Sequence, residues 1–319
     1  MRKIFALLLL ACLTAADAGA QLLYKVSGNG LEKPSYIIGT HHLCNAGFAS
    51  QVTGVRDALV ATDQVYGELI VADAEKPDTV KMLSRMMYLP GGDTLRDVLS
   101  ATQYKEVDAF LKRLMGVGLS SPQVMEKMGR MTPAALAVEL QKVIYMTRHM
   151  GEYDPSSSLD KYFQAQAVKN NEPVGGLETV ERQGRMVFDK PMKRQVEALM
   201  CLIHHEDEYA DSMDELTDAY CSQDLDKLQK AVEKEYGSSC AMTAEEKKEL
   251  IDDRNDAWVK AMPGIMKERP TFFAVGAAHL LGAKGVLQQL RDAGYTVEGV
   301  KCCLAVRGMN AKACALSVA

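Results

Sequence analysis

The sequence has few aromatic residues and lacks the short motifs of the common redox and nucleotide-binding folds. Phe, Trp and Tyr make up 6% of its 319 residues, and there is one tryptophan. No C-x-x-C pair occurs, which argues against a thioredoxin-type redox site and against a zinc ribbon. Phosphate-binding loops, dinucleotide fingerprints and Gly-x-Ser-x-Gly elbows are also absent from the sequence.

Basic runs and long apolar runs are missing too. Lys and Arg total 37 against 42 Asp and Glu, a formal charge of −5, so nucleic acid is not expected as a partner. Beyond the N-terminus no stretch approaches the roughly 20 apolar residues that span a bilayer, and no transmembrane segment is expected there. The hydrophobic content of 47% and charged content of 25% are typical of a folded globular protein.

The N-terminus has the pattern of an export signal. Arg2 and Lys3 precede an apolar run over Ile4–Leu13, and Ala18-Gly19-Ala20 has the small-residue pattern of a cleavage site. The apolar run is too short to cross a membrane. The sequence therefore predicts a signal peptide over residues 1–20.

Cleavage would leave residues 21–319 as a single domain with helical insertions in its middle. The expected location is the periplasm, the cell envelope or the exterior. An alternative is a lipoprotein box over Leu9-Leu10-Ala11-Cys12, with Cys12 acylated. Simple export is preferred because the apolar stretch before Cys12 is short and a good cleavage site follows it.

Cysteine usage fits an oxidising compartment, which permits disulfides. Eight cysteines are present, and loss of Cys12 leaves seven, so at least one thiol stays free. Most are expected to pair within the last third of the chain. Cys302 and Cys303 are adjacent and would face opposite sides of a strand, so a bond between them is not expected. The pairing stays open among Cys44, Cys201, Cys221, Cys240, Cys302, Cys303 and Cys314.

The hydrophobic pattern predicts an α+β fold. A mixed sheet with an N-terminal hairpin and a C-terminal β-α-β unit would be surrounded by a large helical layer. The expected strands are Leu22–Val26, Ser35–Gly39, Gln64–Ile70, Pro173–Leu177, Thr271–Val275 and Tyr295–Val306. The expected helices are Ala46–Ala61, several between Asp93 as an N-cap and His149, Leu159–Lys169, Arg182–His205, Asp211–Cys221, Leu225–Tyr236, Ala244–Met262 and Gly285–Asp292, with a loop over Tyr153–Ser158.

Two histidines share one sequence context, a strand that ends in Gly-x-x-His. They are His42, which closes Gly39-Thr40-His41-His42, and His279, which closes Gly276-Ala277-Ala278-His279. Glu68 follows Gly67 at the end of another strand. Functional groups of α/β folds collect at the carboxyl ends of strands, and two imidazoles with one carboxylate can hold a divalent metal. These three residues are the predicted metal ligands.

The segments SYIIGTHH and FFAVGAAHLLGAKGVLQQLRDAGYTVEGV together resemble the TraB/GumN family, which includes the Tiki metalloproteases. Four further segments fit the resemblance in order: YGEL, SSLDKYFQAQA, VGGLETVERQ and DDRNDAWV. The resemblance covers about Leu22 to Val300. It implies a fold related to erythromycin esterase and ChaN-like proteins, and a metal-dependent hydrolase with His42, His279 and Glu68 at its site. Tiki members are Mn- or Co-dependent proteases. The expected cofactor is a divalent metal, with Mn, Co and Zn as the candidates.

The expected mechanism is metal-assisted hydrolysis. The cation would lower the pKa of a bound water, with Glu68 as third ligand or general base. Arg254 could hold a substrate carboxylate or stabilise an oxyanion; the alternative is a helix-surface ion pair with Asp252 or Glu249. His41 stands where relatives often carry an apolar residue, and would be either an added ligand or a surface imidazole.

Other polar positions have weaker support. Glu178 could be a further ligand or a partner of one, or a glutamate favoured by a helix dipole. Asp160, in the family-like segment, is also a common kind of helix-start residue. His204-His205-Glu206-Asp207-Glu208 fails as a zincin motif because Tyr209 stands where the second histidine is needed. The eighteen methionines are expected in core gaps rather than at a copper site.

The sequence thus predicts an exported metal-dependent hydrolase of peptide-like character, acting on a peptide or another small hydrolysable substrate. The alternative is a non-catalytic envelope protein that binds a peptide, haem or other ligand in the same crevice. No feature of the sequence decides the oligomeric state.

Overall fold

The computed structural model describes residues 21–301 apart from 152–153, 155 and 235–239. The predicted signal peptide, Cys12, the last residues of the predicted final strand, and Cys302, Cys303 and Cys314 lie outside these residues. The expected α+β class is confirmed. A six-stranded sheet has the order β4-β3-β5-β2-β1-β6. Its strands are β1 (Leu23–Ser27), β2 (Ser35–Thr40), β3 (Gln64–Gly67), β4 (Val174–Gly176), β5 (Thr271–Gly276) and β6 (Thr296–Gly299).

The sheet is mixed. Strands β4, β3, β5 and β2 are parallel neighbours, whereas β1 is antiparallel to β2 and to β6. The N-terminal hairpin is confirmed, and Gly28 and Gly30 in its turn take positive φ angles of 79° and 82°. The C-terminal strands are not neighbours: β6 pairs with β1, so β2 and β1 separate it from β5.

Helices supply most of the remaining structure. Between β2 and α7 they are η1 (Ala46–Gln51), α1 (Val55–Val60), η2 (Val71–Glu75), α2 (Pro77–Met87), η3 (Pro90–Gly92), α3 (Leu95–Val98), α4 (Ala101–Met115), α5 (Pro122–Lys127) and α6 (Pro133–Arg148). The rest are α7 (Leu159–Lys169), α8 (Val180–Phe188), α9 (Met192–His204), α10 (Glu206–Cys221), α11 (Leu225–Glu233), α12 (Ala244–Lys247), the π-helix η4 (Lys248–Asp252), α13 (Asp253–Glu268), η5 (Ala277–Leu280) and α14 (Val286–Asp292).

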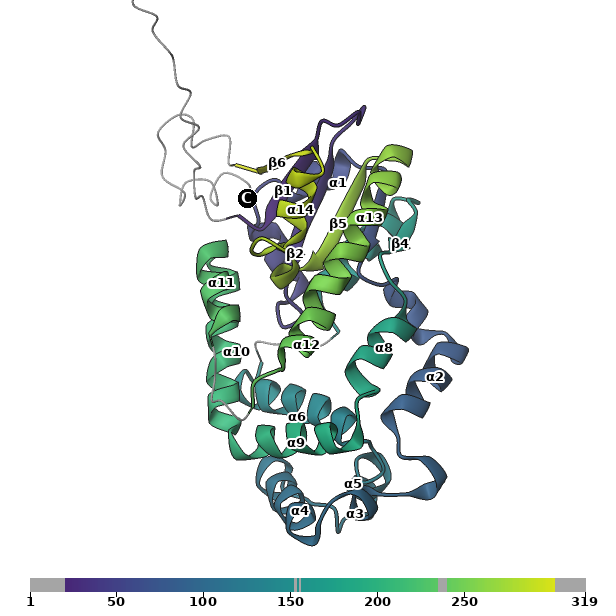
Figure 1. Cartoon of the computed structure of the whole chain (residues 1–319), viewed down its shortest axis with the longest axis vertical. Helices are drawn as coiled ribbons and strands as arrows, with labels where there is room; N and C mark the ends of the chain where they lie inside the picture. Colours follow the sequence, from purple (N-terminus) through teal and green to yellow (C-terminus); the bar gives the residue numbers. More distant parts are fainter. Residues whose placement is uncertain (1–20, 152–153, 155, 235–239, 302–319) are drawn as a thin grey trace, which may run out of the picture.

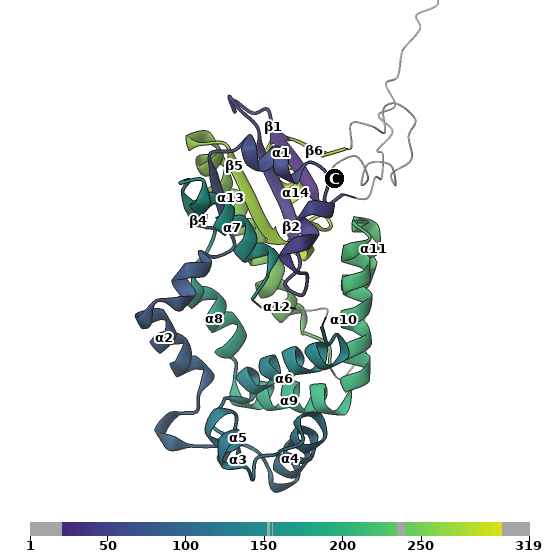
Figure 2. The same ribbon diagram turned by 180° about the vertical axis from the view of Figure 1, so that it is seen from behind.

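Helices cover both faces of the sheet. Helices α13 and α14 lie on the face seen in Figure 1, and α1 and α7 lie on the opposite face seen in Figure 2. Each face has its own core. Phe163 and Phe272 belong to the core beneath α7, and Trp258 and Phe273 to the core beneath α13. Burial of these large aromatic side chains, each favouring folding by about 1.5–3 kcal/mol or more, attaches the helices to the sheet.

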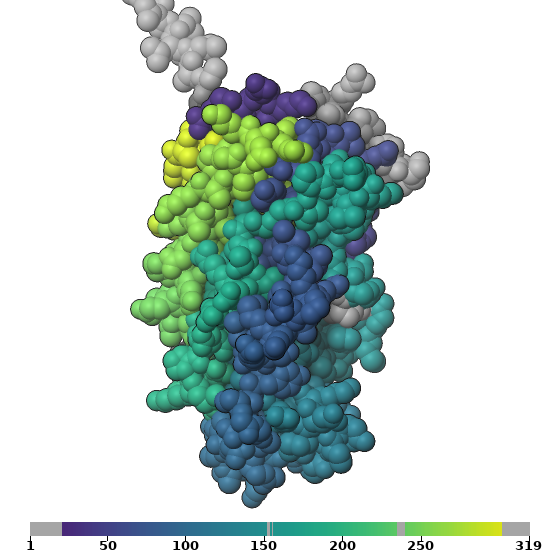
Figure 3. Space-filling view, turned by 90° about the vertical axis from the view of Figure 1, so that its right-hand side faces the viewer, coloured from purple at the N-terminus to yellow at the C-terminus, as the bar shows by residue number. Residues whose placement is uncertain are grey.

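Most of the remaining helices form a separate layer at the carboxyl end of the parallel strands. Two insertions build it, one between β3 and α7 and the other between β4 and α13, and they meet where α6 packs on α9. Leu136 and Leu199 lie in the shared core of this layer. Figure 3 shows the resulting elongated molecule, in which the blue and teal middle of the chain lies at the end opposite to the purple and yellow segments.

Several predicted elements are shorter or interrupted. The strand predicted over Gln64–Ile70 ends at Gly67, because the Gln164 amide bonds to Leu69 O and to Val71 N and draws the chain off the sheet. The helix predicted over Ala46–Ala61 is divided into η1 and α1 at Gly54, whose φ is 81°.

Three further helix predictions need correction. The helix predicted over Arg182–His205 is two helices, since Pro191 cannot continue α8. The helix predicted over Ala244–Met262 passes through a π-helical turn and continues to Glu268, with Pro263 inside it. The N-cap at the start of α3 is Thr94 rather than Asp93. Helix α2 was not predicted at all.

The described cysteines are partly paired. Cys201 and Cys240 form a disulfide, although Cys201 lies before the last third of the chain, where most of the pairing was expected. Cys44 and Cys221 are free thiols. None of the helices in the described part of the chain combines the length and apolar character needed to cross a bilayer.

Candidate functional site

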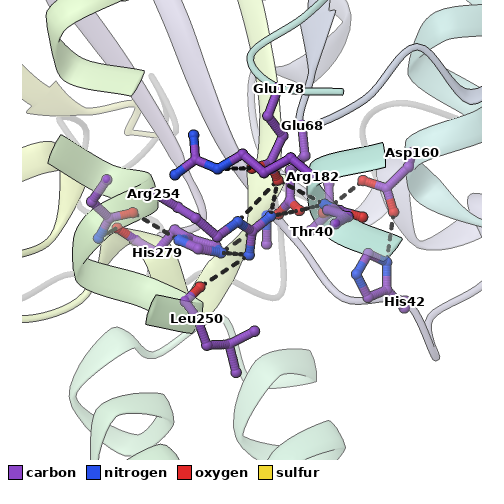
Figure 4. Close-up of polar contacts among 12 residues, drawn as sticks. Thr40, His42, Glu68, Asp160, Glu178, Arg182, Leu250, Arg254 and His279 are labelled. Carbon is purple, nitrogen blue, oxygen red and sulfur yellow. Dashed lines mark hydrogen bonds and ion pairs between the residues drawn. The ribbon is translucent and has the colours of Figure 1, made fainter. Parts of the chain in front are cut away.

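The polar residues singled out in the sequence follow the four parallel strands. His42 comes after β2, Glu68 directly after β3, Glu178 two residues after β4, and His279 in η5 after β5. Parallel strands end at one edge of a sheet, so these side chains are brought to a common edge that faces the helical layer. Figure 4 shows this edge, with Arg254 of α13 between His279 and the two glutamates.

Glycines at the strand ends permit the close approach. A Cβ atom on Gly39 would lie 2.9 Å from the Cβ of Ala277, so β2 and the segment after β5 could not come together with a larger residue there. Gly276 donates its N–H to Glu68 Oε1 at 2.7 Å, and a Cβ on Gly276 would lie 3.0 Å from the same oxygen. A larger residue at Gly39 or Gly276 would therefore crowd neighbouring atoms, which explains why both Gly-x-x-His motifs begin with glycine.

His279 is buried, neutral and held in one tautomer. Asn255 Nδ2 donates to the carbonyl oxygens of His279 and Lys284, which turns Asn255 Oδ1 toward the imidazole. Nδ1 of His279 therefore donates to that oxygen at 2.7 Å, and Nε2 keeps its lone pair. Burial lowers the pKa of His279 to about 4 despite the nearby Glu68. The Trp258 ring packs on the imidazole with ring centroids 4.4 Å apart.

Arg254 joins the other polar groups of the site. Its Nε and Nη2 donate to Glu178 Oε1 at 2.9 and 2.6 Å, and Nη2 also donates to Glu68 Oε2. Nη1 donates to the Leu250 carbonyl at 3.1 Å and to His279 Nε2 at 2.8 Å. All five N–H groups of the guanidinium are thus used within the protein.

The two glutamates depend on this guanidinium. Burial raises the pKa of Glu68, but the Arg254 charge and the Gly276 N–H outweigh it and lower that pKa to about 2. Gln183 Nε2 donates to Glu68 Oε2 and to Glu178 Oε1, at 2.9 Å each. Glu178 Oε2 is buried and accepts no hydrogen bond from any residue that the structure describes.

These contacts overturn two of the plainer sequence interpretations. Arg254 is not on a helix surface with Asp252 or Glu249; its side chain is 5% exposed and pairs with Glu68 and Glu178. Glu178 precedes the first turn of α8 and is bound to Arg254, so a helix dipole does not explain its position.

His42 has a different environment from His279. Its side chain is 73% exposed, and Nδ1 lies 3.0 Å from Asp160 Oδ2. Asp160 is held in turn by the Thr40 hydroxyl, which donates to Oδ1 at 2.9 Å. The hydrogen bond with Asp160 raises the pKa of His42 to about 9, so the imidazole is protonated near neutral pH. Asp160, which opens α7, is thus a direct partner of a predicted site residue.

His41 is not a surface imidazole, and its hydrogen bond goes to a residue of the helical layer instead of a predicted metal ligand. Its Nε2 lies 3.1 Å from the Thr217 hydroxyl of α10, and its ring packs against Tyr220 with centroids 5.2 Å apart. Burial lowers its pKa to about 4. His41 therefore connects the segment after β2 to α10.

Glu68 and His279 have the donor chemistry for a divalent cation. Oε1 of Glu68 and Nε2 of His279 are 3.8 Å apart, within the roughly 4.2 Å that two bonds of about 2.1 Å can span. The Nδ1 bond to Asn255 presents the correct lone pair. A cation at Nε2 would replace the hydrogen bond from Arg254. His42 does not lie within 4.8 Å of both other donors in the described chain.

The group of three donors that does meet this spacing, within the described ranges, is Cys201, His205 and Cys240. Its two sulfur atoms form the disulfide, so neither is a thiolate ligand. His204 lies 3.2 Å from Glu106, and His205 lies 3.4 Å from Glu208. The sequence interpretation of this stretch as a solvated helix end rather than a zincin motif is consistent with these contacts.

A cavity of about 370 Å³ adjoins the site on the side of Glu178. It lies between the segment after β3 and the start of α8, and its lining includes Ile70, Met82, Glu178, Thr179 and Val180. A space of this size accommodates one or two amino-acid side chains.

Comparison with protein-family models identifies the family of the chain. Residues 22–299 match the model of the TraB/PrgY/gumN family. The chain belongs to this family. Its TraB/GumN resemblance in the sequence is therefore confirmed, over nearly the same residues.

Several curated relatives of the chain are metalloproteases by name. Metalloprotease TIKI1 of Danio rerio is 28% identical over 309 residues, covering 84% of this chain and 61% of that protein. Metalloprotease TIKI1 of Homo sapiens is 26% identical over 309 residues, covering 84% and 60%. Metalloprotease TIKI2 of Xenopus tropicalis is 26% identical over 313 residues, covering 83% and 57%. The chain spans about three fifths of the length of these relatives.

Three residues acquire functions that the sequence alone did not reveal. Asn255 orients His279, Gln183 bridges the two glutamates, and Thr40 holds Asp160. Asn255 and Gln183 stand in segments that carry the family resemblance. The resemblance indicated these positions but not what their side chains do. Thr40 stands inside Gly-x-x-His as a wildcard position.

Asn255 offers a direct test of the buried network. We expect Asn255→Ala to lower the free energy of unfolding by about 1–3 kcal/mol, because it leaves Nδ1 and the carbonyl oxygen of the buried His279 without their Asn255 partner. Urea unfolding followed by Trp258 fluorescence measures the change. Gln288→Ala, which removes an exposed hydrogen bond to Asp292, is the control and should cost under about 0.5 kcal/mol. Equal losses in the two variants would contradict the assigned network.

Proposed function

We propose that the protein is a metal-dependent hydrolase that acts on peptide bonds. The supporting observation is the buried pair at the strand ends, where a neutral His279 of fixed tautomer lies 3.8 Å from the ionised Glu68. The similarity to the TIKI1 metalloproteases supports the reaction class. The proposal extends these relatives' activity to a chain that covers part of their length.

Glu68 and His279 would hold the cation, with Mn, Co or Zn as candidates. His42 would complete the ligand set only after it loses its proton and moves closer to the other two donors. A bound divalent cation supplies a Lewis acid and lowers the pKa of bound water to about 7. The hydrogen bond from His279 Nδ1 to Asn255 keeps the proton on Nδ1, so the lone pair of Nε2 stays available to a cation. Gly276 N–H holds Oε1 of Glu68, so the carboxylate enters the reaction already oriented and ionised. His42 would act at the open, water-exposed side of the site.

Arg254 and Glu178 would act mainly by position in this proposal. Because all five guanidinium N–H groups are used, Arg254 has none left over for a substrate carboxylate while these bonds persist. The positive charge of Arg254 would balance the negative charges of Glu68 and Glu178. The Nη1 group that donates to His279 Nε2 would be the one to donate to a developing oxyanion if that nitrogen were a metal ligand. The cavity beside Glu178 would accept a side chain of the substrate.

We further propose that the protein is exported. The N-terminal pattern of residues 1–20 supports this, and so does the Cys201–Cys240 disulfide, since such bonds persist in oxidising compartments. Detection of a mature form that begins at Gln21, by N-terminal sequencing of protein from the host, would test it.

Calorimetric titration of Mn²⁺, Co²⁺ and Zn²⁺ into the purified protein tests the ligand set. Wild type should bind one of these ions, and His42→Ala and Glu68→Gln should bind it more weakly. A peptide library with that ion added then tests the reaction. Metal uptake without turnover would favour a ligand-binding protein at the envelope, and equal uptake by wild type and variants would refute the proposed ligands.

Metal uptake is expected to depend on pH through His42. With a pKa of about 9, raised by Asp160, the imidazole is protonated at neutral pH and must lose a proton before it can bind a metal. The apparent affinity should therefore rise with pH up to about 9. In Asp160→Asn the midpoint should fall toward about 6.5, the ordinary histidine value.

Titrations from pH 6 to 9.5 in buffers of different ionisation enthalpy would report both the affinity and the proton released. Asp214→Asn is the matched control, because it removes the carboxylate partner of His149 in the helical layer. A midpoint that moves in neither variant, or equally in both, would contradict the role given to His42.

A further inference from the structure

We propose that Cys44 and Cys221 form a second disulfide, which joins the segment carrying His41 and His42 to the end of α10. The two sulfur atoms are 3.7 Å apart although the residues are 177 positions apart in the chain. A disulfide has S–S of about 2.05 Å, so a small side-chain movement would be enough to close it. The proposal concerns the covalent structure and does not depend on the proposed hydrolase activity.

The surrounding contacts already hold the two segments in register. Tyr220, next to Cys221, donates its hydroxyl to the carbonyl oxygen of Gly39 at 2.9 Å. Thr217, one turn earlier, contacts His41. The backbone N–H of Cys44 bonds to His41 O at 3.0 Å, so the thiol moves with the histidine segment. Preorganisation of this kind favours formation of the bond, because little backbone freedom is left to lose.

The two thiols differ in access. Cys44 is buried and Cys221 is exposed, so an oxidant from solution would meet Cys221 first. The hydrogen bond from Cys44 lowers the pKa of Cys221 to about 7, which raises its thiolate fraction near neutral pH. The chain already carries one disulfide, Cys201–Cys240, so both bonds would form under the same conditions.

The oxidant is a disulfide-bearing donor, with glutathione disulfide as the probe. The Cys221 thiolate attacks one glutathione sulfur and expels a glutathione thiolate, which leaves a mixed disulfide. Cys44 then gives its proton to water and attacks the Cys221 sulfur, which expels the second glutathione. Overall, two protein thiols and one glutathione disulfide become one protein disulfide and two glutathione thiols. Two electrons and two protons pass from the protein to the donor.

This bond would fix the exposed His42 segment against the helical layer. The strand end is otherwise held there by hydrogen bonds and packing alone. Reduction would loosen the segment while leaving Glu68 and His279 in place, since those residues are held by Arg254 and Asn255. The redox state of Cys44 and Cys221 would thus change the mobility of the His42 segment and not that of Glu68 or His279.

The test uses the full chain, incubated with glutathione disulfide and then alkylated, digested without reductant and analysed by mass spectrometry. We expect a linked pair of peptides that contain Cys44 and Cys221. Thermal unfolding of the same sample should show a melting temperature about 5–10 °C above that of Cys221→Ser treated identically. Because this variant keeps the Cys201–Cys240 bond, the difference isolates the second disulfide.

Two results would overturn the proposal. One is alkylation of both Cys44 and Cys221 after oxidation that is sufficient to close Cys201–Cys240. The other is a linkage of Cys44 to Cys302, Cys303 or Cys314. Ser222→Ala, which alters the neighbouring exposed position without touching a thiol, should retain both the linked peptides and the melting temperature of wild type.

Discussion

Arg254→Met is expected to lower the free energy of unfolding by about 3–5 kcal/mol, because it leaves the buried carboxylates of Glu68 and Glu178 without their cation. Methionine fills a similar volume, so the loss comes from charge rather than from a cavity. Without Arg254 the pKa of Glu68 should rise from about 2 to above its ordinary value.

The sign of the pH dependence follows from this change. In wild type the lowered pKa of Glu68 contributes stability above about pH 4.5, and this contribution is lost as the pH falls toward 2. In Arg254→Met the raised pKa reverses the effect, so the deficit should shrink as the pH is lowered from 8 toward 5. The additional substitution Glu68→Gln should recover part of the deficit at pH 8.

Urea unfolding followed by the fluorescence of Trp258, the one tryptophan of the chain, measures these differences. Arg182→Met is the matched control. Arg182 lies 3.7 Å from Glu178 but its side chain is 44% exposed, so its loss should cost under about 1 kcal/mol. If Arg254→Met costs no more than Arg182→Met, or if Glu68→Gln recovers nothing, the two carboxylates do not depend on Arg254.

His279→Ala is expected to weaken binding of Mn²⁺ or Co²⁺ by more than about 100-fold, since loss of an outer partner alone commonly costs 10–100-fold. Turnover of any peptide substrate should fall below detection. The effect should exceed that of His42→Ala, because His279 is buried and already neutral, whereas His42 must first lose a proton.

Trp258 makes the measurement direct. Its ring centroid is 4.4 Å from that of His279, so a paramagnetic ion bound there should quench its fluorescence. His204→Ala is the control, since His204 is exposed in the helical layer and pairs with Glu106. Thermal unfolding would establish that His279→Ala is folded. Undiminished quenching in a folded His279→Ala protein would exclude this histidine as a ligand.

Local sequence patterns were sufficient for much of the sheet and for the position of Glu68 and His279 at its carboxyl edge. Apolar strands that end in glycine are a local signal, and β1, β2 and β5 lie close to their predicted ranges. The predicted end of β3 was wrong because a side chain distant in the sequence determines where that strand ends. Gln164 of α7 ends β3 before Glu68, and no pattern near residue 68 indicates this.

The pairing of strands was likewise beyond local patterns. Strands β5 and β6 flank α14 and read as one β-α-β unit, yet β6 pairs with β1 at the edge of the sheet. The position of a strand depends on which neighbours offer free backbone groups, and those belong to segments remote in the chain.

The sequence treated His42 and His279 as equivalent, because each follows a glycine-ended strand. Packing made them different. Asn255 and Trp258 enclose His279, and burial keeps it neutral. The exposed His42 instead bonds to Asp160, which stabilises its protonated form. Arg254 shows the same effect, since its helical pattern allowed a surface position and α13 instead directs it at the strand ends.

The amino-acid sequence by itself determined the α+β class, the family, and which residues reach the carboxyl edge of the sheet, because strand periodicity and terminal glycines act within a few residues. Only the tertiary structure decided which of those residues are charged, buried or paired. Arg254 and Glu68 are 186 positions apart, and a pKa depends on the groups that packing brings within a few ångströms, whatever their distance along the chain.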